Sequence, residues 1–212
     1  SPAMLINKNI RNSYNVGYLF LQDIYYSLGL DKICSVISSR YENDYDLNDI
    51  LSMLVYSRII FPGSKKSSLE NSQKFIEQPK CSLHQIYRAL ELLAKENDYL
   101  QAELYKNSKS VVGRKTDILY YDCTNYYFEI EEADDFRKYG MSKEHRPNPI
   151  VQMGLFMDAD GIPLSFSLFE GNKNEQPSMS PLEKKILKDF DTSDFIVCTD
   201  AGLSSTANRK FN

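Results

Sequence analysis

The first half of the chain repeats its apolar positions at helical spacing. Between residues 47 and 61 apolar side chains recur every three or four positions, and Asp46 precedes them as a candidate helix cap. Ser82-Leu-His-Gln85 has the spacing of a capping box, so a helix is expected to begin there. The pattern predicts helices over 14–28, 31–39, 47–61, 64–76, from 82 onward, and 98–109. In the last of these, Leu100 and Leu104 are expected to face inward.

The pattern changes after residues 113–116. Short runs rich in β-branched and aromatic residues follow, and such runs are typical of strands. Strands are predicted over 118–123, 126–130, 150–157, 162–169 and 195–200, with a turn at Thr124-Asn125 and a helix over 181–189. We therefore expect an α+β or α/β fold, with a helical region over residues 4–116 and a mixed sheet with helices over 117–212.

Composition indicates a globular protein of ordinary type. The chain has 212 residues, 42% hydrophobic and 25% charged, which is enough to bury a core. No window holds about 18 consecutive apolar residues, so a membrane partner is not expected. The four cysteines are scattered and form no C-x-x-C pair, which favours reduced thiols and a cytoplasmic location.

Charge is distributed unevenly along the chain. The net charge is −4, but residues 5–116 carry 15 basic and 12 acidic side chains, whereas residues 117–212 carry 10 basic and 17 acidic ones. An acidic balance is unusual for a protein that binds nucleic acid. It favours a cytosolic globular protein with no nucleic-acid role, and this alternative stays open.

Two carboxylates stand in similar settings. Asp122 and Asp200 each come near the end of a short apolar run and are followed by polar residues. If the last strand crosses over a helix to lie parallel beside the first, both carboxylates emerge at neighbouring strand ends. Such a pair would attract Mg²⁺, a hard cation that prefers oxygen, and would suit phosphodiester chemistry. Taken alone, Asp122 is better explained as a residue that caps a turn through its own backbone.

Five motifs follow in order from the first strand onward. They are Tyr120-Tyr-Asp-Cys-Thr124, Tyr139-Gly-Met-Ser-Lys-Glu-His-Arg-Pro147, Gly161-Ile-Pro-Leu164, Phe169-Glu-Gly-Asn172 and Thr199-Asp-Ala-Gly-Leu-Ser204. Through them, residues 118–212 resemble the ribonuclease H-like core of DDE transposases of bacterial insertion sequences, in the insertion sequence 4 type group.

The resemblance implies a function and a site. Asp122 and Asp200 would be the first two catalytic carboxylates and would hold Mg²⁺ or Mn²⁺. The full-length enzyme of this mobile element would cleave and join phosphodiester bonds. Its partner would be double-stranded DNA, both element ends and target, and its active complex would contain a homodimer. Phosphate contacts are expected from Lys143, His145, Arg146, Asn208, Arg209 and Lys210, flanking the carboxylates.

One part of the family pattern is absent. The third carboxylate of the family is a Glu on a later helix, in a pattern of Tyr, Arg, Glu and Lys. No Tyr in this chain has an Arg three residues further on. We interpret the chain as an amino-terminal fragment that lacks the final Glu and is inactive by itself. A non-catalytic DNA-binding or regulatory module on the same fold is the alternative.

The helical region leaves a second question open. Residues 62–66, Pro-Gly-Ser-Lys-Lys, precede two short predicted helices and could belong to a DNA-binding helix-turn-helix. A plain helical bundle with solvated basic residues explains the same pattern.

Overall fold

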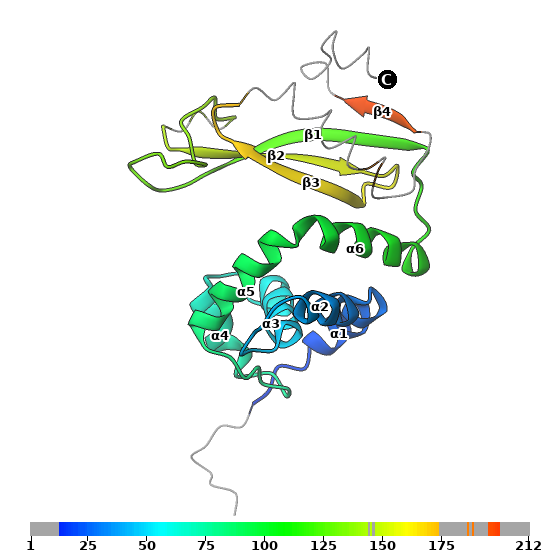
Figure 1. Cartoon of the computed structure of the whole chain (residues 1–212), viewed down its shortest axis with the longest axis vertical. Coiled ribbons are helices and arrows are strands. Elements are labelled where there is room, and N and C mark those ends of the chain that lie inside the picture. The colour runs from blue at the N-terminus through cyan, green and yellow to red at the C-terminus, as the bar shows by residue number, and fades with distance from the viewer. Residues whose placement is uncertain are drawn as a thin grey trace, which may run out of the picture. The chain divides into compact units, whose positions relative to one another are not determined.

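The computed structural model of the protein describes residues 13–143, 145, 147–173, 186, 188 and 195–199. These residues form six α-helices and then a four-stranded mixed sheet (Figure 1), which confirms the expected α+β arrangement. They group into two compact units that divide between Leu100 and Gln101. Within the described residues, no helix is long and apolar enough to cross a membrane.

Two of the helices begin at the capping residues that the sequence predicts. Asp46 accepts a hydrogen bond from the backbone N–H of Asp49 at 3.0 Å, and Ser82 and Gln85 make both bonds of the predicted capping box. The helices are α1 (Tyr18–Ser27), α2 (Leu30–Ser39), α3 (Leu47–Ile60), α4 (Lys65–Ser72), α5 (Leu83–Lys95) and α6 (Asn97–Val111). Helix α4 is shorter than the predicted 64–76 because few apolar side chains anchor it.

The first unit is built around α3, which contacts α1, α2, α4 and α5. An aromatic cluster fills its core. The ring of Tyr18 lies 5.6 Å from that of Tyr56 and 4.5 Å from that of Phe75, and Tyr25 meets Tyr56 edge-on at 5.7 Å. Aromatic pairs at such distances stabilise a core beyond the area that they bury. Gly29 has φ 65°, the left-handed conformation that lets α2 start directly after α1.

The second unit contains the sheet. Its strands are β1 (Ile118–Tyr127), β2 (Ile150–Met157), β3 (Pro163–Glu170) and β4 (Ile196–Thr199), in the order β3-β2-β1-β4. Neighbours β1 and β2, and β2 and β3, are antiparallel, whereas β4 lies parallel to β1. The last strand thus lies beside the first in the orientation expected for two neighbouring strand ends.

Two linked predictions for the sheet are wrong, the turn at Thr124-Asn125 and the separate strand over 126–130, because one strand runs from Ile118 to Tyr127. Thr124-Asn125 is not a turn, because β1 continues through both residues and pairs with β2 at Thr124–Met153 and Asn125–Gln152. A Thr-Asn pair has a local preference for turns. Here a full ladder of backbone hydrogen bonds to β2 outweighs that preference, as tertiary context commonly does.

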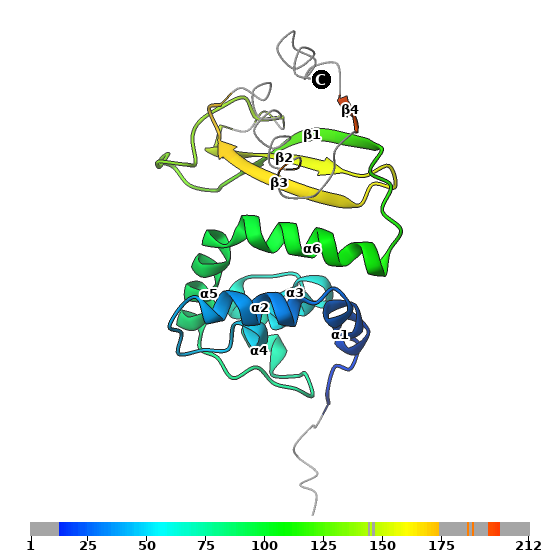
Figure 2. The same cartoon turned by 45° about the vertical axis from the view of Figure 1, so that its right-hand side comes forward.

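Alternate residues of β1 face a core shared with α6. Leu119, Tyr121 and Cys123 are buried there with Tyr105 of α6 and Phe156 of β2. From its Gln101 onward, α6 lies along this sheet, as Figure 2 shows. The helix does not use the predicted inward pair, Leu100 and Leu104, which are only half-buried. Its fully buried positions are Gln101, Tyr105 and Ser108.

Candidate functional site

Asp122 lies in the middle of β1 rather than near the end of a buried strand. It points to the face opposite the core, on the same side as Tyr120, and its side chain is 64% exposed. Its Oδ1 accepts a hydrogen bond from the adjacent N–H of Cys123 at 2.8 Å. The carboxylate is therefore well solvated and open to a ligand from this side.

Among the described residues, Lys143 places a positive charge beside this carboxylate. Its Nζ lies 3.9 Å from Oδ1 of Asp122 and donates a hydrogen bond to the backbone carbonyl of Cys123. Its own backbone N–H donates to Oδ1 of Asn125 at 3.4 Å. All three contacts are to β1, so a residue chosen from the sequence as a phosphate ligand lies against the predicted catalytic Asp.

The loop that carries Lys143 is fastened to the sheet at its base. Lys138 and Ile150 exchange two backbone hydrogen bonds, at 2.8 and 3.1 Å. Gly140 crosses Gly171 so closely that a Cβ on Gly140 would lie 1.9 Å from the carbonyl oxygen of Gly171. Only glycine fits at this crossing, and the crossing holds the loop near the carboxyl-terminal end of β3.

Most other predicted site residues lie outside the described part of the chain. These are Asp200, Arg146, Asn208, Arg209 and Lys210. His145 is described: it is exposed, has φ 54°, and donates its backbone N–H to the carbonyl of Ser142 at 3.0 Å. Of the predicted set, the structure thus brings together Asp122 and Lys143.

The register of β4 bears on Asp200. Thr199, the residue before it in the sequence, pairs with Tyr121, the residue before Asp122. Cys198 pairs with Tyr120, which shares the face of Asp122. The two strands are therefore parallel and stay in register up to Tyr121 and Thr199, the residues that precede the two carboxylates.

The described residues around Asp122 do not by themselves form a site for a cation. The Asp122 carboxylate and the Cys123 carbonyl are both oxygen donors of the kind that Mg²⁺ prefers, and the ammonium of Lys143 already lies against both. That ammonium supplies a positive charge at this point of β1. Among the described residues, no group of three His, Cys, Asp or Glu side chains is placed to hold a metal ion.

A buried ion pair that sequence analysis missed supports the same sheet. Nε of Arg114 lies 2.7 Å from Oδ2 of Asp158, and the side chains are 4% and 0% exposed. Oδ1 of Asp158 also accepts the N–H groups of Asp160 and Ile162, at 3.1 and 2.9 Å. The sequence marks Asp158 as a turn residue, but only the fold brings Arg114 to it. The pair is structural and joins the β2–β3 turn to the segment before β1.

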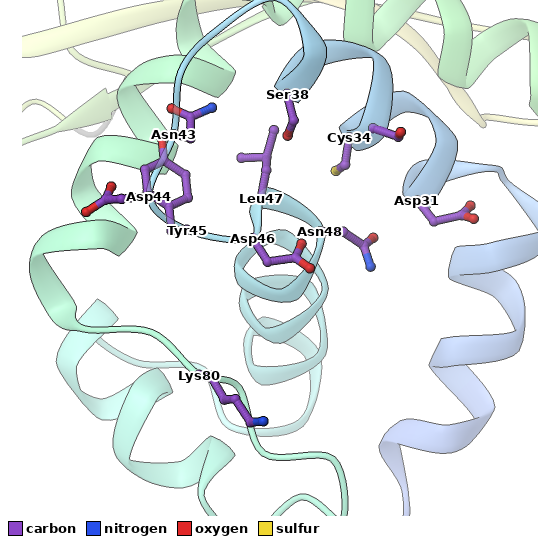
Figure 3. A pocket seen from close by; sticks show the side chains of 11 residues that line it. Asp31, Cys34, Ser38, Asn43, Asp44, Tyr45, Asp46, Leu47, Asn48 and Lys80 are labelled. Atoms are coloured by element: carbon purple, nitrogen blue, oxygen red, sulfur yellow. The ribbon is translucent and has the colours of Figure 1, made fainter.

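The first unit contains a separate cavity of about 600 Å³ beside the amino-terminal end of α3 (Figure 3). Three carboxylates line it, those of Asp31, Asp44 and Asp46. Two of them have structural partners: Asp46 caps α3, and Asp44 lies 2.6 Å from the guanidinium of Arg88. These contacts explain their positions without a ligand.

Cys34 lines the same cavity with a buried thiol. Burial raises the pKa of this thiol to about 11, so it stays protonated near neutral pH. The hydroxyl of Tyr25 lies 3.8 Å from its sulfur and donates to Oδ1 of Asn48 at 2.9 Å. A protonated, buried thiol is a poor nucleophile. Cys34 therefore does not provide this cavity with a nucleophilic thiolate.

Comparison with known proteins shows a distant structural likeness. No family model matches the chain, and no curated protein matches it. One matching solved structure is the "Mos1 transposase paired-end complex with left transposon end", with a TM-score of 0.31 and 11% sequence identity. The match covers 80% of this chain and 57% of the Mos1 chain. This chain therefore spans little more than half the length of the Mos1 chain. A likeness this distant assigns neither a family nor an activity to the chain.

Proposed function

We propose that the second unit carries the first two carboxylates of a metal-dependent DNA strand-transfer site of the DDE transposase kind. Asp122 and Asp200 would hold Mg²⁺ or Mn²⁺, and double-stranded DNA would be the substrate. Such metals activate the attacking oxygen and stabilise the leaving one during phosphodiester transfer. The proposal requires the carboxylate of Asp200 to lie beside that of Asp122.

The observation that supports this proposal is the parallel pairing of β1 and β4. Tyr121 and Thr199 face each other across the ladder, and each precedes one of the two carboxylates in the sequence. Adjacent strands lie about 4.8 Å apart, which is a distance at which two carboxylates can share a cation. The sequence motifs that contain these two strands favour the same chemistry.

Different residues of the chain would serve different parts of this proposed site. Asp122 faces solvent from the middle of a strand that β2 pairs along most of its length, so its backbone is held in one place. Lys143, on the fastened loop, lies where it can meet a DNA phosphate that approaches this carboxylate. The buried pair Arg114–Asp158 and the contacts of α6 would stabilise the sheet on which Asp122 lies.

The test is DNA cleavage by the gene-length protein in Mn²⁺. We expect Mn²⁺-dependent nicking that is lost in Asp122→Asn and in Asp200→Asn. Asp160→Asn is the matched control, because Asp160 lies in the β2–β3 turn and pairs with Lys115. Nicking that survives both site substitutions would refute the proposal.

A second candidate is a DNA-binding or regulatory module without catalysis. It is favoured by the ammonium of Lys143, which lies 3.9 Å from Asp122 and could face a DNA phosphate without any metal. Salt-dependent DNA binding without any Mn²⁺-dependent cleavage would support this second candidate. Absence of DNA binding at low salt would refute both.

A further inference from the structure

A small cavity in the first unit lies among α1, α3 and the segment that follows α4. Its volume is about 70 Å³, the space of about two water molecules. The rings of Tyr18, Tyr56 and Phe75 line it, together with the carboxylates of Asp49 and Glu77. The ring of Phe75 lies 4.5 Å from that of Tyr18 and 6.4 Å from that of Tyr56. The aromatic cluster of this unit therefore forms part of the cavity wall.

Tyr56 places a buried hydroxyl beside this cavity. The residue is 4% exposed, and its hydroxyl has no hydrogen-bond partner among the described residues. Burying a hydroxyl without a partner costs free energy, so such groups are normally satisfied. Burial raises the pKa of the Tyr56 hydroxyl, and Tyr26 and Glu77, which both line the cavity, raise it further. The hydroxyl is therefore protonated, lies near the cavity lining and lacks a protein partner there.

Two carboxylates of the lining have no counter-charge. Oδ2 of Asp49 accepts the backbone N–H of Lys80 at 2.9 Å, and Oε2 of Glu77 accepts the side-chain amide of Gln22 at 2.7 Å. Within the described part of the chain, neither carboxylate forms an ion pair, and no basic side chain lines the cavity. Water would fill the space but would leave both negative charges unbalanced.

We propose that this cavity binds the ammonium group of an alkylamine. A primary ammonium has N–H donors and no acceptor, and the cavity lining offers acceptors in the Tyr56 hydroxyl and in the carboxylates of Asp49 and Glu77. Its positive charge is attracted both by the carboxylates and by the faces of the aromatic rings. Since a water takes about 30 Å³, the cavity admits the ammonium and about one methylene. This site belongs to the helical unit and does not depend on the DNA chemistry proposed for the sheet.

The first measurement is backbone amide NMR of the 212-residue chain during titration with methylammonium chloride. Two N–H groups report on the cavity: that of Glu77, which donates to the Tyr18 hydroxyl at 3.1 Å, and that of Lys80 on Asp49. Both signals are expected to move with methylammonium. They are expected to stay fixed with potassium chloride at equal ionic strength and with methanol, a neutral molecule of similar size.

A second probe distinguishes two sources of the ammonium group. Nα-acetyl-lysine amide presents it at the end of a lysine side chain, whereas methylammonium presents it as a free amine. Tighter binding of the lysine derivative would assign the site to a lysine of a partner peptide, and tighter binding of methylammonium would assign it to a small amine. Movement of the reporters by neither probe would overturn the proposal, and water would then be the occupant.

Tyr56→Phe is the decisive variant because it keeps the ring and removes the hydroxyl. We expect it to weaken methylammonium binding about tenfold, since hydrogen bonds to charged groups are strong. Its melting temperature without amine is expected to equal or exceed that of the parent chain, because the hydroxyl has no partner to lose. That measurement also shows that the variant is folded. Unchanged methylammonium affinity in Tyr56→Phe would overturn the proposal.

The carboxylates supply a matched pair of variants. Glu77 is exposed, so Glu77→Gln is expected to weaken methylammonium binding only about twofold to fivefold. Asp23→Asn removes an exposed carboxylate of α1 that does not line the cavity, and it is expected to leave the affinity unchanged. An equal loss in both variants would indicate general attraction of a cation to an acidic surface and would overturn the site.

Discussion

The side-chain amide of Gln101 on α6 bonds to both backbone polar groups of Phe166 on β3. Its Oε1 accepts the Phe166 N–H at 2.7 Å, and its Nε2 donates to the Phe166 carbonyl at 3.2 Å. Oε1 also accepts the hydroxyl of Ser165 at 2.8 Å. Since β3 is an edge strand of the described sheet, the amide substitutes locally for a neighbouring strand.

Replacing Gln101 by Leu is expected to destabilise the second unit. It leaves the Phe166 N–H and the Ser165 hydroxyl without their partner, which costs about 1–3 kcal/mol of unfolding free energy. Urea unfolding measures the loss, and amide hydrogen exchange at Phe166 is expected to quicken. Lys106→Ala, on the exposed side of α6, is the control. Unchanged exchange at Phe166 would show that the amide does not protect this edge.

Two neighbouring carboxylates in the β2–β3 turn offer a matched pair of variants. Asp158→Ala leaves the buried guanidinium of Arg114 without its counter-charge, and breaking a buried pair costs about 3–5 kcal/mol of unfolding free energy. Asp160→Ala removes only an exposed pair with Lys115, so its loss is expected to be far smaller. Equal losses in urea unfolding would mean that the buried pair has no special role.

The Cys34 thiol predicts a pH dependence for the first unit. Burial raises the pKa of this thiol from 9.0 to about 11, so the folded state favours the protonated form. Below pH 9 the thiol is protonated in both states and the contribution to stability is complete. From there to about pH 11 the unfolded chain ionises first, and stability falls. Urea unfolding across this range is expected to show a shallower decline in Cys34→Ala; identical slopes would contradict the prediction.

DNA binding is expected to depend on the loop over β1. In the chain with Lys143→Gln and Arg146→Gln, affinity is expected to fall to a similar extent for unrelated DNA sequences, since phosphate contacts carry no sequence information. The slope of log affinity against log salt should decrease by about 0.9 for each phosphate that no longer meets a cation. Lys106→Gln with Lys115→Gln removes the same charge elsewhere in the second unit. An equal effect of that control would indicate general charge rather than a site.

We expect the 212-residue chain not to nick or join DNA. On the proposed function, two Asp carboxylates would leave a second metal ion with too few protein ligands, and both metals would be needed to stabilise the attacking and leaving oxygens. A supercoiled-plasmid assay in Mg²⁺ and Mn²⁺ compares the chain with Asp122→Ala. Nicking that disappears in the variant would show that these residues already form a complete site.

Local sequence signals determined where most elements begin. The Asp46 cap and the Ser82-Gln85 capping box both start helices as predicted, because each side chain bonds to backbone groups only three residues away. The predicted strand over 150–157 matches β2 residue for residue, and its largely apolar run suits a strand that is paired on both edges. The choice of Asp122 and Lys143 as site residues also came from sequence, through the motifs in which they lie.

Tertiary structure decided what depends on residues far apart in the chain. The backbone at Thr124 stays extended because β2 pairs with it, and α6 turns Gln101 inward, where Phe166 can use its amide. The meeting of Arg114 with Asp158, and of Lys143 with Asp122, likewise needs the folded sheet. Short-range hydrogen bonds can be read from spacing alone. Contacts across 20 or more positions depend on how the backbone folds, which no local pattern in this sequence contains.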